Sequence, residues 1–242
     1  MTYCVAIKVD AGIVCLADTR TNAGLDNISK FKKLFTWTKP GERAVTMMTA
    51  GNLAITQAVM NLLQENVDKA VDGIETVYTA PTMFRLAEIV GDAMRIVQNR
   101  YGPGLNARGE DTTASIIVAG QRSGGPLRIF LVYAAGNFIE ATPDTPYFQI
   151  GEHKYGKPII DRVTKADMPL EDVQKLALLS MDSTLRSNLS AGMPLDMTVL
   201  PAGQYAFSKE RRIEWSDADY QAISTQWSDY LSRAFNDIPC EE

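Results

Sequence analysis

The sequence predicts an α+β fold, a four-layer αββα sandwich in which two antiparallel sheets pack face to face and a helix pair covers the outside of each. Strand-like and helix-like segments alternate in groups: strands, two helices, strands, then two helices. No repeat or linker divides the 242 residues, and sandwiches of this length commonly form one domain. We expect one domain over residues 1–242, with a helical extension from about residue 216.

The chain opens with strand signals. Residues 3–9 are rich in β-formers, residues 10–12 are typical of a turn, and residues 13–17 form an apolar run, which together predict a hairpin. Two further strands are predicted at residues 31–37 and 44–49, with a Lys-Pro-Gly turn between them. Four strands are thus expected before the first helix.

The next segment has the three- and four-residue apolar period of amphipathic helices. One helix is predicted from Leu53 to near Gly73. A second follows Pro81, and Gly102-Pro103-Gly104 is expected to stop it.

Strand signals then return and predict a second meander over residues 113–119, 127–133, 138–141 and 148–150. Two helices and two short strands complete the layers: helices over 157–164 and 170–185, strands over 197–200 and 211–215. Ser216-Asp217-Ala218-Asp219 is typical of a helix start. The apolar residues of this last helix recur at helical spacing: Tyr220, Ile223, Trp227 and Leu231.

Composition excludes several classes of protein. With 24 basic and 29 acidic side chains and a net charge of −5, the chain has no excess of cations for nucleic acid or an anionic membrane surface. The longest apolar stretch, around residues 129–135, is far shorter than the roughly 18 residues that cross a bilayer. The N-terminal residues do not resemble a secretory signal, so we expect a cytoplasmic protein.

The cysteines and the single histidine limit the possible chemistry. Cys4, Cys15 and Cys240 lack the spacing of a disulfide framework and are expected to be buried or terminal thiols. His153 alone cannot build zinc sites that need two histidines. No Gly-x-Ser-x-Gly motif or Walker-type loop is present. We expect neither a metal nor a cofactor.

Thr2 is small enough for the initiator Met1 to be removed. Removal would leave a threonine hydroxyl beside its own α-amine, whose pKa near 8 lets it accept the hydroxyl proton at neutral pH. One residue would then supply nucleophile and base. Many chains begin Met-Thr, so this pattern alone does not identify an enzyme.

Asp18 directly follows the second predicted strand, where an unpaired charge is costly. Arg20 and Lys33 are the nearby cations. Side-chain alternation places Lys33 with Phe35 and Trp37 on one strand face, so we expect Lys33 to turn inward and pair with Asp18. Its charge would lower the pKa of a neighbouring hydroxyl or α-ammonium. A purely structural ion pair explains these two residues equally well.

Gly51 lies between a predicted strand and a predicted helix. A glycine there permits close backbone approach, and the N–H groups at the helix start could stabilise an oxyanion. Glycine in such a turn also occurs for geometry alone.

Taken in order, these features resemble the β-type proteasome family of N-terminal-nucleophile hydrolases. The resemblance rests on four matches: Thr2 leading a hairpin, Asp18-Thr19-Arg20-Thr21-Asn22-Ala23-Gly24, Lys32-Lys33, and Ala50-Gly51 before a helix. Within the family the chain resembles the bacterial branch called Anbu, on these segments: residues 2–8, residues 151–158 and the extra C-terminal helix.

The resemblance implies the N-terminal-nucleophile hydrolase fold, with Thr2 as nucleophile and its amine as base. It implies Lys33 and Asp18 as the activating pair and the N–H of Gly51 as oxyanion donor. Three residues are implied to line the substrate cleft: Thr21, Asn22 and Leu53. It also implies a ring-like or helical homo-oligomer.

Two positions depart from the family pattern. Gly151-Glu152-His153 stands where the family commonly has Gly-Ser-Gly. Ser187 stands where the family has an aspartate, whereas the serine that follows this aspartate by three residues is kept as Ser190. Losing that carboxylate weakens the hold on the amine, and Glu152 could supply another charge. Lys33 also needs a one-residue gap relative to the family spacing.

We therefore predict a threonine-type peptidase or amidase acting on peptide or related amide bonds. Two alternatives stay open: a non-catalytic or very weakly active proteasome-like scaffold, and a small-molecule amidase.

Overall fold

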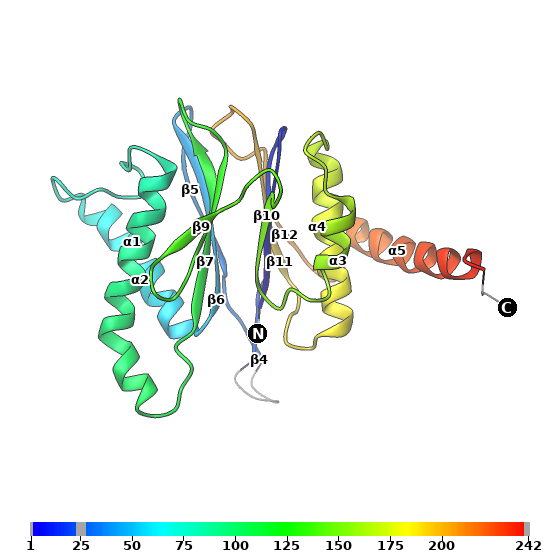
Figure 1. The fold of residues 1–242 in the computed structure, drawn as a ribbon, viewed down its shortest axis with the longest axis horizontal. Helices are drawn as coiled ribbons and strands as arrows, with labels where there is room; N and C mark the ends of the chain where they lie inside the picture. The colour runs from blue at the N-terminus through cyan, green and yellow to red at the C-terminus, as the bar shows by residue number, and fades with distance from the viewer. Residues whose placement is uncertain (1, 23–27, 240–242) are drawn as a thin grey trace.

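The computed structural model describes residues 2–22 and 28–239. Its layers confirm the predicted sandwich: a helix pair, two face-to-face sheets and a second helix pair (Figure 1). Cys240, Met1 and the segment 23–27, which includes Ala23 and Gly24 of the matched motif, lie outside the described residues.

The first sheet has five antiparallel strands in the order β10-β1-β2-β11-β12. The opening hairpin is confirmed, with Cys4 opposite Ala17. The strands are β1 Tyr3–Val9, β2 Gly12–Asp18, β10 Tyr147–Gly151, β11 Leu195–Pro201 and β12 Lys209–Ile213.

The second sheet has five antiparallel strands in sequence order. They are β5 Leu34–Lys39, β6 Arg43–Gly51, β7 Ala114–Arg122, β8 Arg128–Val132 and β9 Phe138–Glu140. A separate small hairpin joins β3 Arg20–Asn22 to β4 Ile28–Lys30. The described chain therefore has six strands before its first helix, not four, because strands of three residues carry too little periodic signal to predict.

The predicted second meander is wrong in its pairing. β7, β8 and β9 extend the second sheet, whereas β10 crosses to the first sheet and pairs with β1. A strand's own sequence specifies which side chains are buried but not which neighbour satisfies its backbone N–H and C=O groups. The crossing matters for the site because it places residue 151 opposite Tyr3.

Helices α1 Leu53–Lys69 and α2 Met83–Asn106 cover the second sheet, and α3 Lys157–Val163 and α4 Leu170–Ser187 cover the first. α2 does not stop at the Gly-Pro-Gly sequence but continues through Pro103. A proline removes the hydrogen bond that its own N–H would donate, yet its carbonyl still accepts, here from the N–H of Ala107 at 3.1 Å. The last turn therefore closes.

Lys33 turns inward, as predicted, but the alternation argument is wrong. β5 starts only at Leu34, so Lys33 precedes the strand. Phe35 and Trp37 pack in the core beneath α1 and α2, whereas Leu34 belongs to the core between the sheets. Lys33 reaches the inter-sheet side because the irregular chain before β5 follows no two-residue alternation.

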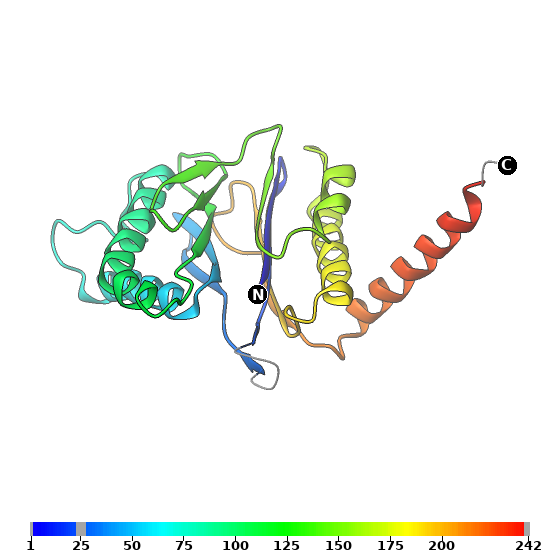
Figure 2. The same cartoon turned by 60° about the horizontal axis from the view of Figure 1, so that its bottom comes forward.

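The last helix, α5 Ala218–Asp237, projects away from the four layers in both views (Figures 1 and 2). Asp217 caps it by accepting the N–H of Tyr220 at 3.0 Å, and the hydroxyl of Tyr220 donates to Asp182 of α4 at 3.0 Å. Only the N-terminal half is anchored: Leu231 is 50% and Phe235 79% exposed. In the described part of the chain, no helix is long and apolar enough to span a membrane.

Small side chains line the space between the two sheets, among them Cys4, Ala6, Cys15, Ala17 and Ala119. Cys4 and Cys15 are free and buried, and burial raises the pKa of Cys15 to about 12. These small residues let the sheets pack closely, because interiors are filled to crystal-like density.

This packing predicts that the inter-sheet layer does not tolerate larger residues. We expect Ala6→Leu, at a fully buried position, to lower the free energy of unfolding by roughly 1–3 kcal/mol because the core is overpacked. Urea denaturation measures the change. Ala222→Leu, on the exposed side of α5, is the matched control, and equal losses in both variants would contradict the prediction.

Candidate active site

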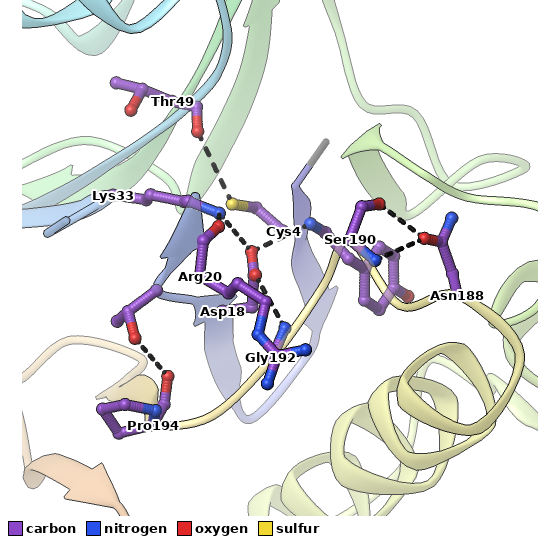
Figure 3. A network of polar contacts seen from close by, with 11 residues as sticks. Cys4, Asp18, Arg20, Lys33, Thr49, Asn188, Ser190, Gly192 and Pro194 are labelled. Atoms are coloured by element: carbon purple, nitrogen blue, oxygen red, sulfur yellow. Dashed lines mark hydrogen bonds and ion pairs between the residues drawn. The ribbon is translucent and has the colours of Figure 1, made fainter. Parts of the chain in front are cut away.

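Asp18 stands at the centre of the candidate site. It ends β2 with a side chain that is 0% exposed. One carboxylate oxygen, Oδ1, accepts from Lys33 Nζ at 2.7 Å and from the N–H of Tyr3 at 3.0 Å. Oδ2 accepts from the N–H of Gly192 at 3.1 Å (Figure 3). Burial raises the pKa of Asp18, and Lys33 and the two backbone donors act against that rise.

Lys33 is held by both its side chain and its backbone. It is 3% exposed, and Nζ donates to the carbonyl of Arg20 at 2.5 Å as well as to Asp18. Its own carbonyl accepts the N–H of Thr49 from β6 at 3.0 Å. The bonds to Asp18 and to the Arg20 carbonyl use two of the three N–H donors of the Lys33 ammonium.

Thr2 lies directly before β1 and is 7% exposed. The peptide group that joins it to Tyr3 is fixed on both sides: the Thr2 carbonyl accepts the N–H of Glu152 at 2.6 Å, and the Tyr3 N–H donates to Asp18. Gly151 makes this approach possible with φ +83°, because a Cβ there would lie 1.9 Å from the Thr2 carbonyl oxygen. Thr2 and the Asp18–Lys33 pair are therefore brought together through shared hydrogen bonds.

Gly51 ends β6 at an exposed position with φ +101°. A Cβ there would lie 2.1 Å from the carbonyl oxygen of Thr113, so a larger residue would displace the strand end. The next residue, Asn52, caps α1 by accepting the N–H of Ile55 at 3.2 Å. The strand end and the helix start are thus fixed relative to each other.

A second polar cluster connects Glu152, Asn188 and Ser190. Asn188 donates through Nδ2 to Glu152 Oε2 at 3.2 Å and accepts through Oδ1 from the hydroxyl of Ser190 at 2.5 Å. Ser187, which the resemblance implies stands where the family has an aspartate, is exposed at the end of α4. The structure thus joins Glu152 and Ser190 through a residue that the sequence analysis did not single out. An asparagine after a helix is common, so no sequence signal marked Asn188.

The structure describes the side chains of two of the three predicted cleft residues. Thr21 is half-buried in β3, directly after the residue whose carbonyl binds Lys33. Leu53 is half-buried at the first position of α1, two residues after Gly51. The backbone of Asn22 belongs to β3, but its side chain lies outside what the structure describes.

Two other reactive side chains near the site have ordinary roles. Cys4 is fully buried with Sγ 3.8 Å from the carbonyl oxygen of Thr49, and burial raises the pKa of its thiol. A buried thiol with a raised pKa is a poor nucleophile. His153 is exposed, with Nδ1 3.4 Å from the carbonyl oxygen of Gly151. Among the residues that the structure describes, neither forms a nucleophile–base pair with a neighbouring side chain.

The chain is similar to known proteins over most of its length. A family model described as proteasome subunit matches residues 2–200. No curated protein matches the sequence. Among solved structures, the chain is similar to a Gly-1 mutant of Anbu from Hyphomicrobium sp. strain MC1, at 47% identity, TM-score 0.93 and coverage of 100% of both chains.

Two further solved structures are similar over almost their full length. Anbu (ancestral beta-subunit) from Yersinia bercovieri is 42% identical, with a TM-score of 0.92 and coverage of 99% of this chain and 98% of that chain. The Anbu complex from Pseudomonas aeruginosa, a helical assembly, is 44% identical, with the same TM-score of 0.92 and the same coverage of 99% and 98%. The similarity therefore includes α5, which the family model does not reach.

The buried ion pair predicts a pH-dependent loss of stability. We expect Lys33→Met to lower the free energy of unfolding at pH 7.5 by about 3–5 kcal/mol, because it leaves Asp18 charged and without its cation. The pKa of Asp18 is already raised by burial and rises further without Lys33. As the pH falls, the folded variant therefore takes up a proton before the unfolded chain does, and the loss shrinks.

Urea denaturation at pH 7.5 and pH 5 measures both effects. Lys32→Met is the matched control, because Lys32 is exposed and should change stability little at either pH. A loss for Lys33→Met that stays constant between the two pH values would contradict the interpretation.

Proposed function

Because the chain belongs to the proteasome subunit family, we propose that it is a threonine-type hydrolase of peptide or related amide bonds, with Thr2 as nucleophile after removal of Met1. The buried Asp18–Lys33 pair, hydrogen-bonded to the peptide group that follows Thr2, is the observation that carries the proposal. A surface lysine could not provide the same field, since water would screen it.

In the proposed reaction the Thr2 hydroxyl attacks the substrate carbonyl carbon, and its proton passes to the α-amine of the same residue. The amide C–N bond then breaks, and the ammonium returns that proton to the departing amine. The acyl group remains bound to Thr2 as an ester. A water molecule, deprotonated by the α-amine, attacks the ester and restores the hydroxyl.

We assign Lys33 and Asp18 to electrostatic activation. Lys33 keeps one N–H beyond its bonds to Asp18 and Arg20, which is available to the Thr2 oxygen as negative charge develops. Asp18 holds the ammonium in place and keeps it charged. Their effect is strong because the pair is removed from solvent.

The remaining roles concern the substrate. We assign the N–H of Gly51 to the oxyanion that forms on attack, because Gly51 lies at an exposed strand end that immediately precedes a capped helix. Ser190 and Glu152 are assigned to the α-amine. The substrate cleft is assigned to Thr21, Asn22 and Leu53.

We also propose that the chain assembles with copies of itself. The similar Anbu complex from Pseudomonas aeruginosa is a helical assembly, and 98% of that chain is covered by this one. α5 supports the proposal, because its outer half exposes Tyr230, Leu231, Phe235 and nearby Ile238. Apolar residues grouped on a projecting helix are typical of a surface that another chain covers.

The nucleophile can be tested directly. We expect intact mass spectrometry to find the chain without Met1, and a β-lactone or epoxyketone probe to add covalently to Thr2. Thr2→Ala should remove both labelling and peptide turnover, because no hydroxyl remains, while Thr2→Ser should retain labelling. A chain that keeps Met1 and is not labelled would favour the non-catalytic scaffold. Turnover that survives in Thr2→Ala would exclude this mechanism.

The substrate class needs a separate comparison. If the chain is a peptidase, it should cleave fluorogenic peptides faster than small-molecule amides that release the same fluorogenic leaving group. The reverse order would favour the small-molecule amidase.

Assembly is tested through α5. We expect Phe235→Ser combined with Leu231→Ser to shift the protein toward smaller species in analytical ultracentrifugation, because both side chains are at least half exposed in the single chain. Asn236→Ser, on the same exposed turn, is the control. An unchanged sedimentation profile in the double variant would exclude this helix as the contact.

A further inference from the structure

The segment from Asn188 to Gly192 is anchored on both sides of the Thr2–Tyr3 peptide. At one end, Asn188 donates to Glu152, whose N–H binds the Thr2 carbonyl. At the other end, the N–H of Gly192 binds Asp18, whose carboxylate also accepts the Tyr3 N–H. The segment therefore lies against the start of β1, as Figure 3 shows.

The hydrogen bonds of Asn188 determine the direction of the Ser190 hydroxyl. Oδ1 of Asn188 accepts the Ser190 backbone N–H at 2.9 Å and the Ser190 hydroxyl at 2.5 Å. A backbone N–H can only donate, so the atom facing it must be the amide oxygen, which fixes the orientation of the amide. The same oxygen cannot donate to the hydroxyl. The proton of Ser190 therefore points to Asn188, and its oxygen offers only lone pairs to other groups.

Glu152 has acceptor capacity that its neighbours do not fill. It is 8% exposed, and its two oxygens accept from Asn188 Nδ2 and from the N–H of Lys154, both at 3.2 Å. An ionised carboxylate has about four acceptor sites. None of the ion pairs among the described residues includes Glu152. A buried carboxylate without a cation is unfavourable. Removal of Met1 would create a cationic α-ammonium on Thr2, whose carbonyl accepts the N–H of Glu152.

We propose that Asn188 is a positioning residue that presents Ser190 and Glu152 as acceptors to the α-amine of Thr2. Its contact with Ser190 orients the lone pairs of the hydroxyl oxygen, and its contact with Glu152 holds the carboxylate in place. Both groups then stabilise the ammonium that forms during attack. Asn188 thereby replaces the function of the aspartate that is missing at Ser187. The inference rests on the proposed function, since the α-amine exists only after Met1 is removed.

The α-amine can be titrated without any catalysis. In a Thr2→Ala background, acetylation of the N-terminal amine by acetic anhydride, followed by mass spectrometry of the N-terminal peptide from pH 6 to 10, reports the pKa of the amine. We expect Asn188→Ala to lower that pKa by about half a unit or more, because the acceptors lose their orientation. Ser187→Ala, one residue away and exposed, should leave it unchanged.

Two further variants separate positioning from loop structure. Asn188→Asp keeps the oxygen that binds Ser190 and brings a second carboxylate beside Glu152, so we expect it to raise the pKa of the amine. Glu152→Gln combined with Asn188→Asp exchanges the acid and the amide, restores one charge and one amide donor, and should return the pKa toward the parent value. This exchange also serves if Asn188→Ala fails to fold.

In the Thr2 parent, we expect Asn188→Ala to slow β-lactone labelling by up to about threefold above pH 9, because the amine is unprotonated in both proteins there and half a pKa unit corresponds to about a threefold change in its basicity. The midpoint of the labelling pH profile should fall together with the titrated pKa. An amine that titrates identically in the parent, Asn188→Ala and Asn188→Asp, with Met1 removed in all three, would overturn the role of Asn188 and leave the proposed function standing. Retention of Met1 would overturn both.

Discussion

The buried contact between Lys33 and Asp18 is the interaction on which the site depends. A carboxylate without access to water is costly unless a cation and hydrogen-bond donors compensate its charge, and Asp18 has donors from three separate segments: Lys33 before β5, Tyr3 in β1, and Gly192 after α4. The cost of leaving any one unpaired holds these segments together. The same requirement that stabilises the charge therefore assembles the surroundings of Thr2.

Close backbone approach provides the second constraint. Gly151 lets β10 reach the carbonyl of Thr2, and Gly51 lets the end of β6 reach Thr113. Both are places where a Cβ would overlap a backbone oxygen, so steric exclusion rather than flexibility explains the glycines. The rigid peptide at the start of β1 and the rigid turn before α1 lie at the ends of strands from different sheets. The sandwich thus fixes Thr2 at the start of a strand of the first sheet and Gly51 at the end of a strand of the second.

The polar cluster of Glu152, Asn188 and Ser190 lies beside the Thr2–Tyr3 peptide. The sequence resemblance implies that the family has an aspartate where this chain has the exposed Ser187. In this chain the buried carboxylate of Glu152 directly follows β10, and Asn188 is hydrogen-bonded to both Glu152 and Ser190. An amide between a carboxylate and a hydroxyl can fix the direction of both hydrogen bonds, since its two ends have opposite polarity. The buried carboxylate thus lies on a different segment from Ser187.

Periodicity and residue type are local properties, and they were enough to predict the succession of the longer helices and strands and to select Thr2, Asp18 and Lys33 as candidates. These local patterns did not predict that β10 pairs with β1 or that α2 passes Pro103. Side-chain alternation was the wrong explanation for the inward Lys33, because Lys33 precedes β5. The packing of the sheets was needed to show which segments meet at Asp18 and that Asn188 lies between Glu152 and Ser190. The contacts of Asp18 and the contact between Asn188 and Glu152 join residues at least 15 positions apart in the chain, and burial selects them only once the sheets have packed.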